Sequence, residues 1–245
     1  MGDRPLHDIR YFESAVDLSA GGSFPVYAGT LFDLPHTATA FGQRVGRLAE
    51  LKGLSIGRST HLYLCFSAAL PEGAVRITKT SVASWHLIVM AGLPAGFNGL
   101  PEASREALVS SLTFRALSEL AVAGADQLPE IQQQIEAGGE ALRLPVKSRT
   151  SRGFGIAIEQ TIPCHPAASE VFATIQSLES GQTATVKLGE VAFYDEVPTL
   201  VDRISVKGHT LQVHPRKSFR ASLVTSTCGP LPDVDLATLF PLKLH

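Results

Sequence analysis

The chain has little charge, few cysteines and no long apolar run. Charged residues make up 18% of its 245 residues, with 21 Lys and Arg against 23 Asp and Glu. A protein that is held on nucleic acid or anionic lipid by bulk charge needs a clustered excess of cations. The near-balance therefore argues against nucleic acid as a partner. Hydrophobic residues reach 44%, which is too many for a disordered chain.

The three cysteines, Cys65, Cys164 and Cys228, are odd in number, widely spaced and without a CxxC pair. This pattern argues against a disulfide framework and a structural zinc site, and it predicts reduced thiols. Residues 1–8 mix charges and lack the apolar core of a secretory signal. The uncharged stretch 80–101 contains prolines and glycines that break a membrane helix. We therefore expect a cytoplasmic protein without a membrane span.

The motifs of common catalytic sites are missing. The chain has no Walker A, GxSxG, HExxH or EF-hand pattern, and residues 151–155 supply only a GxG. Cys164 and His165 are adjacent, a placement that rarely aims a thiol at an imidazole. His209 and His214 face opposite sides of an expected strand, so they share a metal ion only if the strand bulges. We predict no catalytic residue, no cofactor and no metal ligand.

Apolar periodicity predicts the elements of the first half. Apolar residues at three- and four-residue spacing indicate an amphipathic helix that ends before Gly53. Strict alternation, with Leu62, Leu64 and Phe66 on one side, indicates a strand. The expected elements are helix 37–52, strand 61–67, turn 71–73, strand 74–80, strand 85–90, helix 101–124 and helix 129–137.

The second half is expected to be richer in strands. The basic segment Arg143–Gly153 is interrupted by a proline, and we interpret it as a boundary, which gives domains 1–146 and 147–245. The expected elements are strand 155–161, helix 166–178, strand 183–197 with a bulge near Gly189, a hairpin of 201–206 with 210–214, an edge strand 220–226 and a docked tail 236–244.

Strands followed by helices, without strict βαβ alternation, indicate the α+β class. We predict mainly antiparallel sheets with a few packed helices. Whether the chain forms two similar halves or one continuous domain is left open by the pattern, as is the oligomeric state.

Two basic clusters and a few aromatic residues are the candidate contact residues. The clusters, at residues 147–152 and 216–220, form one cationic patch if the sheet unites them, and ordinary solvated charge otherwise. Trp85, the single tryptophan, is flanked by an apolar strand and is expected in the core. The residues expected at an exposed binding surface are Tyr63, Tyr194, Arg216, Phe219 and Arg220.

One stretch resembles a known class of proteins. It runs through strand His61–Phe66, turn Leu70–Gly73, strand Trp85–Leu93, loop Gly96–Leu100 and the helix containing Leu112–Leu117. This succession resembles bacterial immunity proteins, which neutralise polymorphic or contact-dependent toxins. It departs from them at Met90-Ala91, where an acidic or polar residue is expected. The resemblance implies a non-catalytic protein that blocks a toxin by occlusion, and it brings over no catalytic residue.

Two other functions are compatible with the sequence. One is an enzyme with a pocket between the halves that recruits Cys164, His165, His209 or the cationic patch. The other is a structural or scaffold subunit that associates symmetrically through an apolar edge strand.

Overall fold

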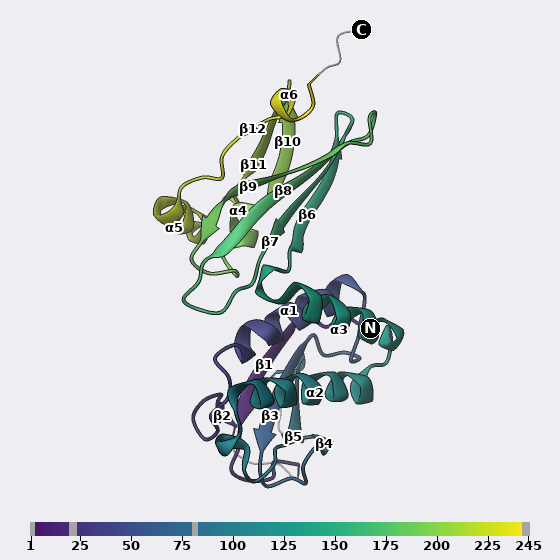
Figure 1. Cartoon of the computed structure of the whole chain (residues 1–245), viewed down its shortest axis with the longest axis vertical. Helices are drawn as coiled ribbons and strands as arrows, with labels where there is room; N and C mark the ends of the chain where they lie inside the picture. Colours follow the sequence, from purple (N-terminus) through teal and green to yellow (C-terminus); the bar gives the residue numbers. More distant parts are fainter. Residues whose placement is uncertain (1–2, 20–23, 80–82, 242–245) are drawn as a thin grey trace. The chain divides into compact units, whose positions relative to one another are not determined.

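The computed structural model describes residues 3–19, 24–79 and 83–241. Its fold is α+β, as predicted, with three sheets in which most strand pairs are antiparallel. The chain forms two compact units, Met1–Gly139 and Glu140–His245 (Figure 1). The segment expected to separate them, Arg143–Gly153, instead contains strand β6, Leu144–Ser151. The two units also differ in topology, so they are not similar halves.

The first unit is built on a five-stranded sheet in the order β2-β1-β3-β5-β4. Its strands are β1 (Asp8–Glu13), β2 (Val26–Tyr27), β3 (His61–Ser67), β4 (Val75–Ile77) and β5 (His86–Gly92). The three central strands are parallel, and the short edge strands β2 and β4 run antiparallel to their neighbours. The predicted strand 74–80 therefore pairs with β5, and its last residue lies outside the described residues.

Three helices, α1 (Ala38–Leu51), α2 (Glu102–Leu120) and α3 (Leu128–Gly138), accompany this sheet (Figure 1). All three confirm predicted helices. Gly42 and Gly46 let α1 approach β1 closely: a Cβ on Gly42 would stand 2.9 Å from the carbonyl oxygen of Ile9. Tyr11 points toward the same side, where its hydroxyl lies 2.9 Å from Thr113 Oγ1 of α2. The helices therefore cover the face of the sheet that carries Ile9 and Tyr11.

A buried carboxylate fastens the loop that follows β2. Glu13, the last residue of β1, is 0% exposed. Its Oε1 accepts a hydrogen bond from Gly29 N at 2.7 Å, and its Oε2 accepts from the backbone N–H groups of Thr30, Leu31 and Phe32 at 2.9, 2.5 and 3.2 Å. Successive N–H groups turned toward one point make an anion-binding concavity. Here the chain fills that concavity with its own side chain.

The second unit contains two antiparallel sheets, β6-β7-β8-β9 and β10-β11-β12. Besides β6, its strands are β7 (Phe154–Gln160), β8 (Ser169–Ser177), β9 (Thr183–Val191), β10 (Arg203–Lys207), β11 (Thr210–His214) and β12 (Val234–Asp235). Its helices are α4 (Val197–Leu200), α5 (Phe219–Cys228) and α6 (Leu236–Leu239). One apolar cluster joins both sheets, from Ile156 on β7 to Leu211 on β11. The predicted hairpin and the bulge near Gly189 are confirmed.

Two predicted elements of this unit are wrong. The helix expected at 166–178 is strand β8, in which Val171, Ala173 and Ile175 are buried alternately with more exposed neighbours. The edge strand expected at 220–226 is helix α5, which begins after Ser218, whose side chain accepts a hydrogen bond from Ala221 N at 3.2 Å. Flanking prolines and glycines indicated a helix in the first segment, and short alternation indicated a strand in the second. Both signals are local, whereas the element that forms depends on pairing and packing with distant parts of the chain.

Among the helices that the structure describes, none is long and apolar enough to cross a membrane.

Candidate functional site

The face of the first sheet that the helices leave uncovered is divided between an apolar and a polar half. Toward the C-terminal ends of the strands, Leu18 and Leu70 pack over Cys65, Ile88 and Met90. The backbone N–H of Leu18 also donates to Met90 Sδ at 2.9 Å. The polar half lies at the opposite ends of the strands. We call it the histidine–aromatic face, and it consists of Asp8, Arg10, His61, Tyr63, Trp85 and His86.

Strand register brings three of these residues into one row. Asp8 of β1 pairs with His61 of β3, and His61 pairs with His86 of β5. Residues in register on adjacent strands project from the same face of a sheet. Arg10 and Tyr63 form the next row on this face, because Arg10 pairs with Tyr63. The cluster therefore depends on the parallel pairing of strands distant in sequence.

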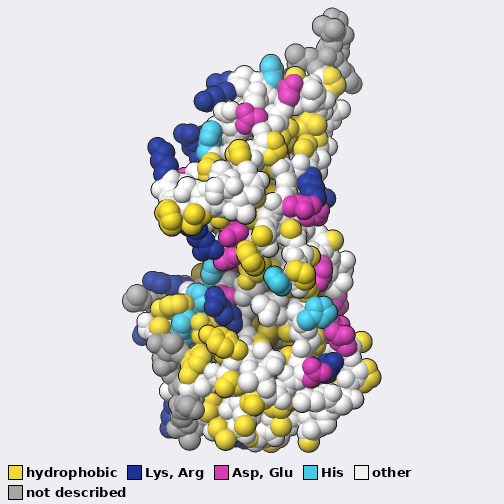
Figure 2. All heavy atoms as spheres, turned by 90° about the vertical axis from the view of Figure 1, so that its left-hand side faces the viewer, with side chains coloured by type: hydrophobic (Ala, Val, Ile, Leu, Met, Phe, Trp, Pro, Cys, Tyr) yellow, Lys and Arg dark blue, Asp and Glu magenta, His cyan; other side chains and the backbone are white. Residues whose placement is uncertain are grey.

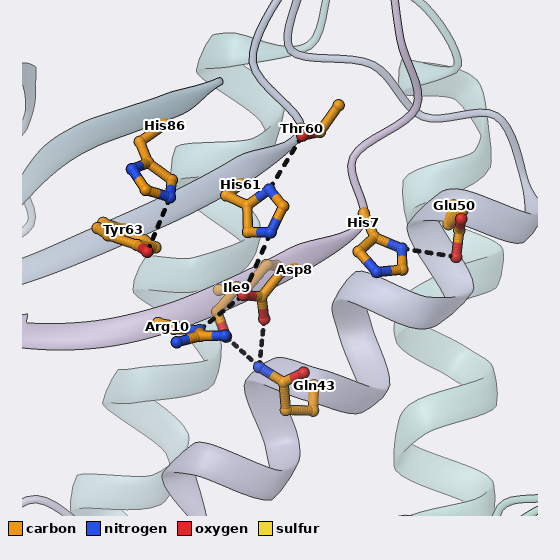
Figure 3. A network of polar contacts seen from close by, with 10 residues as sticks. All are labelled: His7, Asp8, Ile9, Arg10, Gln43, Glu50, Thr60, His61, Tyr63 and His86. Carbon is orange, nitrogen blue, oxygen red and sulfur yellow. Dashed lines mark hydrogen bonds and ion pairs between the residues drawn. The ribbon is translucent and has the colours of Figure 1, made fainter. Parts of the chain in front are cut away.

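A polar network surrounds the Asp8 carboxylate (Figure 3). Arg10 Nε donates to Asp8 Oδ2 at 2.6 Å, and Gln43 Nε2 of α1 donates to Asp8 Oδ1. His61 Nε2 lies 3.8 Å from Asp8 Oδ2, and His61 Nδ1 is 2.9 Å from Thr60 Oγ1. The Asp8 side chain is only 6% exposed. The ion pair and the amide hydrogen bond offset the cost of burying its charge.

Tyr63 and His86 form a second pair on this face. The Tyr63 hydroxyl lies 3.0 Å from His86 Nε2, and their rings stack with centroids 4.4 Å apart. The other ring nitrogen, His86 Nδ1, is buried and has no hydrogen-bond partner among the described residues. Desolvation raises the pKa of the Tyr63 hydroxyl above its usual value. The phenol is therefore protonated at neutral pH.

Ring contacts continue across the face. The Trp85 ring lies 3.7 Å from that of His86 and 4.6 Å from that of His61, measured between centroids. Trp85 is 44% exposed, so the prediction that it belongs to the core is wrong. It precedes β5 and packs its indole beside imidazoles, which leaves one side of the ring to solvent. In the space-filling view, histidine, cationic and hydrophobic side chains lie next to one another on this unit (Figure 2).

On the other side of Tyr63, aromatic residues extend the ring contacts to the edge of the sheet. Phe12 contacts Tyr63, Phe24 and Tyr27, with centroids 4.8, 5.2 and 5.7 Å apart. Phe24 is 44% exposed and Tyr27 is 78% exposed, whereas Phe12 is buried. The buried Phe12 ring thus supports two exposed rings beside the histidine–aromatic face.

The histidines of this region have shifted pKa values, but not in one direction. Desolvation lowers the pKa values of His61 and His86 below the usual value. The pKa of His7 is raised because its Nδ1 hydrogen-bonds Glu50 Oε2 at 3.0 Å, and the same bond lowers the pKa of Glu50. At neutral pH the imidazoles of His61 and His86 are therefore uncharged.

The arrangement is better suited to binding than to nucleophilic chemistry. The thiol of Cys65, which lies on β3 two residues after Tyr63, is buried, and desolvation raises its pKa to about 12. A thiol held in its protonated form is a poor nucleophile. In the described ranges, no group of three or more His, Cys, Asp and Glu is placed to hold a metal ion. What the face offers outward is aromatic area, imidazoles and a guanidinium.

The residues predicted to bind a partner lie in different units. Tyr63 is 8% exposed and part of the first unit, so it is not the exposed contact residue that the sequence indicated. Phe219 is 79% exposed at the start of α5. Arg220 Nη2 pairs with Asp195 Oδ2 at 2.7 Å, next to the half-buried Tyr194. Arg216, also exposed, precedes the helix. Four of the five predicted residues thus lie on or near α5.

The two basic clusters make different contacts. Lys147 donates to the carbonyl oxygen of Asp202, and Arg149 Nη1 donates to that of Ile204 at 2.7 Å, which joins β6 to β10. Arg220 of the second cluster instead pairs with Asp195. The first cluster therefore stabilises the packing of the second unit.

The side chains named for the enzyme alternative are also dispersed over the second unit. Cys164 is buried, and the His165 ring stacks on Phe193 at 6.2 Å. His209 lies in the turn between β10 and β11, and His214 Nε2 is 2.8 Å from Ser205 Oγ.

Most residues of the histidine–aromatic face were not predicted from the sequence to belong to a binding site. Asp8 and Arg10 belong to β1, which was not predicted, although Asp-Ile-Arg-Tyr-Phe-Glu alternates over its first four residues. His61 and His86 were placed on strands, yet only the parallel register shows that they are neighbours.

Comparison of the chain with family models, with curated proteins and with solved structures found no match. The function must therefore be inferred from the residues and their geometry.

Proposed function

We propose that this chain is a non-catalytic binding protein of the toxin-immunity type, and that it docks its partner on the histidine–aromatic face and the flanking rings of Phe24 and Tyr27. Occlusion of a toxin requires a surface that binds another protein tightly, without chemistry of its own. The resemblance of residues 61–117 to immunity proteins supports the class of partner.

The observation that carries the proposal is the exposure of anchor-type side chains on the first sheet and beside it. Tyr27 is 78% exposed, Trp85 44% exposed, and the Arg10 side chain 58% exposed. Trp, Tyr and Arg are the residues that contribute most to binding at protein interfaces. Tyr27 contacts the buried Phe12 ring, Arg10 pairs with the buried Asp8, and Trp85 packs against His86, and these contacts restrict their motion. Side chains held in place before binding lose less entropy when the partner docks.

Helix α5 of the second unit supplies another exposed apolar surface. Phe219 and Leu223 are 79% and 51% exposed and lie one helical turn apart. Arg220 and Arg216 flank them. This surface contains most of the contact residues predicted from sequence. The experiment below therefore tests it as the alternative binding surface.

The test is neutralisation of a toxin in living cells. Each toxin encoded by the source organism is produced in a host strain with and without the chain, and surviving cells are counted. We expect the wild-type chain to restore growth against one toxin. The double variant Tyr27→Ala, Trp85→Ala should reduce survival about tenfold or more, because it removes two anchors.

Two controls locate the surface. Val122→Ala removes an exposed side chain of the first unit that is 61% accessible and lies outside the face. Phe219→Ala with Leu223→Ala tests α5. Protection that persists in the face variant and disappears in the α5 variant would move the interface to α5. A wild-type chain that protects against no toxin would overturn the proposal.

A further inference from the structure

The exposed polar groups of the histidine–aromatic face are cationic or can become so. The Arg10 side chain is 58% exposed, whereas its partner Asp8 is 6% exposed and is held by Arg10 and Gln43. His61 and His86 are partly exposed. Among the six residues of this face, the single carboxylate is thus turned inward and the guanidinium outward.

The two imidazoles lie close enough to act together. The ring centroids of His61 and His86 are 5.5 Å apart. Asp8 and Arg10 of β1 face both rings, and His7 faces His61 with centroids 5.9 Å apart. Tyr63 of β3 and Trp85 complete the surroundings. Glu50 and Arg47 of α1 act on His7.

We propose that this face accepts an acidic surface of its partner, with partner carboxylates placed against Arg10 and the imidazoles of His61 and His86. The inference rests on the proposed function and names the chemistry of the partner for the same site. Charge complementarity carries it, because an apolar partner would bury the exposed guanidinium without a new acceptor.

The proposal predicts how the affinity for the partner depends on pH. A carboxylate brought next to an imidazole favours the imidazolium form. Affinity for an acidic partner must therefore increase as the pH falls through the range where histidine titrates. An apolar or basic partner would show the opposite trend, because desolvation by the one or repulsion by the other disfavours the imidazolium form in the complex. Because desolvation lowers the pKa values of His61 and His86 in the free chain, the increase continues until the pH is below their usual value of 6.5.

The probe is a fluorescein-labelled polyglutamate peptide of about ten residues, which stays ionised well below neutrality. Its binding to the full chain is measured by fluorescence anisotropy at pH about 7.5 and about 5.8, at low and high salt. We expect about fivefold tighter binding at the lower pH and weaker binding in salt. A polylysine peptide of the same length is the reference for charge sign.

Two variants assign the effect to the face. Arg10→Ala should weaken polyglutamate binding about tenfold. The matched control is Arg115→Ala on α2, because Arg115 is 54% exposed and likewise ion-paired, with Glu119. His61→Gln combined with His86→Gln should abolish the pH dependence, and His36→Gln, which alters an exposed histidine elsewhere in the unit, should leave it unchanged.

The outcomes separate this inference from the proposed function. Equal binding of polyglutamate by wild type, Arg10→Ala and Arg115→Ala would overturn the acidic-partner proposal, as would tighter binding of polylysine. Toxin neutralisation that survives Arg10→Ala and the double histidine variant would overturn it too, while the immunity function stands. Specific polyglutamate binding by a chain that neutralises no toxin would leave the face an acidic-partner site and remove the immunity function.

Discussion

Replacing the buried Glu13 by glutamine should destabilise the first unit more than any surface change. The carboxylate accepts hydrogen bonds from four backbone N–H groups of residues 29–32, three of them through Oε2. In Glu13→Gln an NH2 group replaces one carboxylate oxygen, and because an NH2 group donates hydrogen bonds it cannot accept one from a backbone N–H. Each buried donor left without an acceptor costs about 1–3 kcal/mol.

The magnitude follows from which donors lose their acceptor. The glutamine places its amide oxygen at the Oε2 position, where it keeps the hydrogen bonds of Thr30, Leu31 and Phe32, so the N–H of Gly29 loses its acceptor and faces the NH2 group. These loop residues are partly exposed, so water compensates for some of the loss. One donor left without an acceptor gives a decrease of about 1–3 kcal/mol in the free energy of unfolding. Since Thr30 Oγ1 also donates to the carbonyl oxygen of Tyr27, at 2.7 Å, the variant should also weaken partner binding.

The assay uses the single tryptophan. Trp85 belongs to the first unit, so its fluorescence during urea denaturation reports the unfolding of that unit. Glu72→Gln, which alters an exposed carboxylate of the same unit, is the control and should leave the urea midpoint in place. A decrease of less than about 1 kcal/mol in Glu13→Gln would refute the reasoning, because it would mean that the loop N–H groups are satisfied equally well without the charge.

Two further perturbations test the face and the packing beneath it. Because folding lowers the pKa values of His61 and His86, their contribution to stability is fully present above pH 6.5 and is lost as the pH falls through their lowered values. The variant His61→Gln, His86→Gln should therefore lose less stability than wild type between pH about 6.5 and 5, measured by the urea midpoint. An equal loss of stability in both proteins would contradict the pKa shifts. Gly42→Ala should lower the free energy of unfolding by about 1–2 kcal/mol, because its Cβ would lie 2.9 Å from the Ile9 carbonyl oxygen. Gly96→Ala, whose Cβ meets open space, is the control for thermal unfolding, and an equal effect would exclude the close approach as the cause.

Local patterns were sufficient for most elements of the first unit. Helix α1 and strand β3 were predicted almost to the residue, because their apolar spacing is long and regular. The order of the strands was not predicted, since β1 was missed and the pairing of β3 with β5 involves no local signal. In the second unit, the prolines and glycines on both sides of β8 led to the wrong prediction of a helix.

The candidate site was harder to predict than the fold. Tyr63 was predicted to be an exposed contact residue, yet it is buried, and it contacts His86 through a hydrogen bond and ring stacking. Trp85 was assigned to the core, although nearly half of it is exposed. Whether a residue at the end of a strand is covered depends on loops that approach from elsewhere in the chain, and periodicity carries no information about them. Phe219 was predicted to be exposed, and it is.

The edge strands of the first sheet have a consequence for how recognition through the proposed binding face can change. Strand β2 has two residues and β4 has three, so neither offers a long row of backbone groups to another chain. Recognition through the sheet must then come from side chains and not from backbone pairing with another chain. Such positions can be substituted one at a time without disturbing the backbone beneath them. A fold of this kind can follow a rapidly varying target by exchanging a few side chains, while its core and its pairing stay the same.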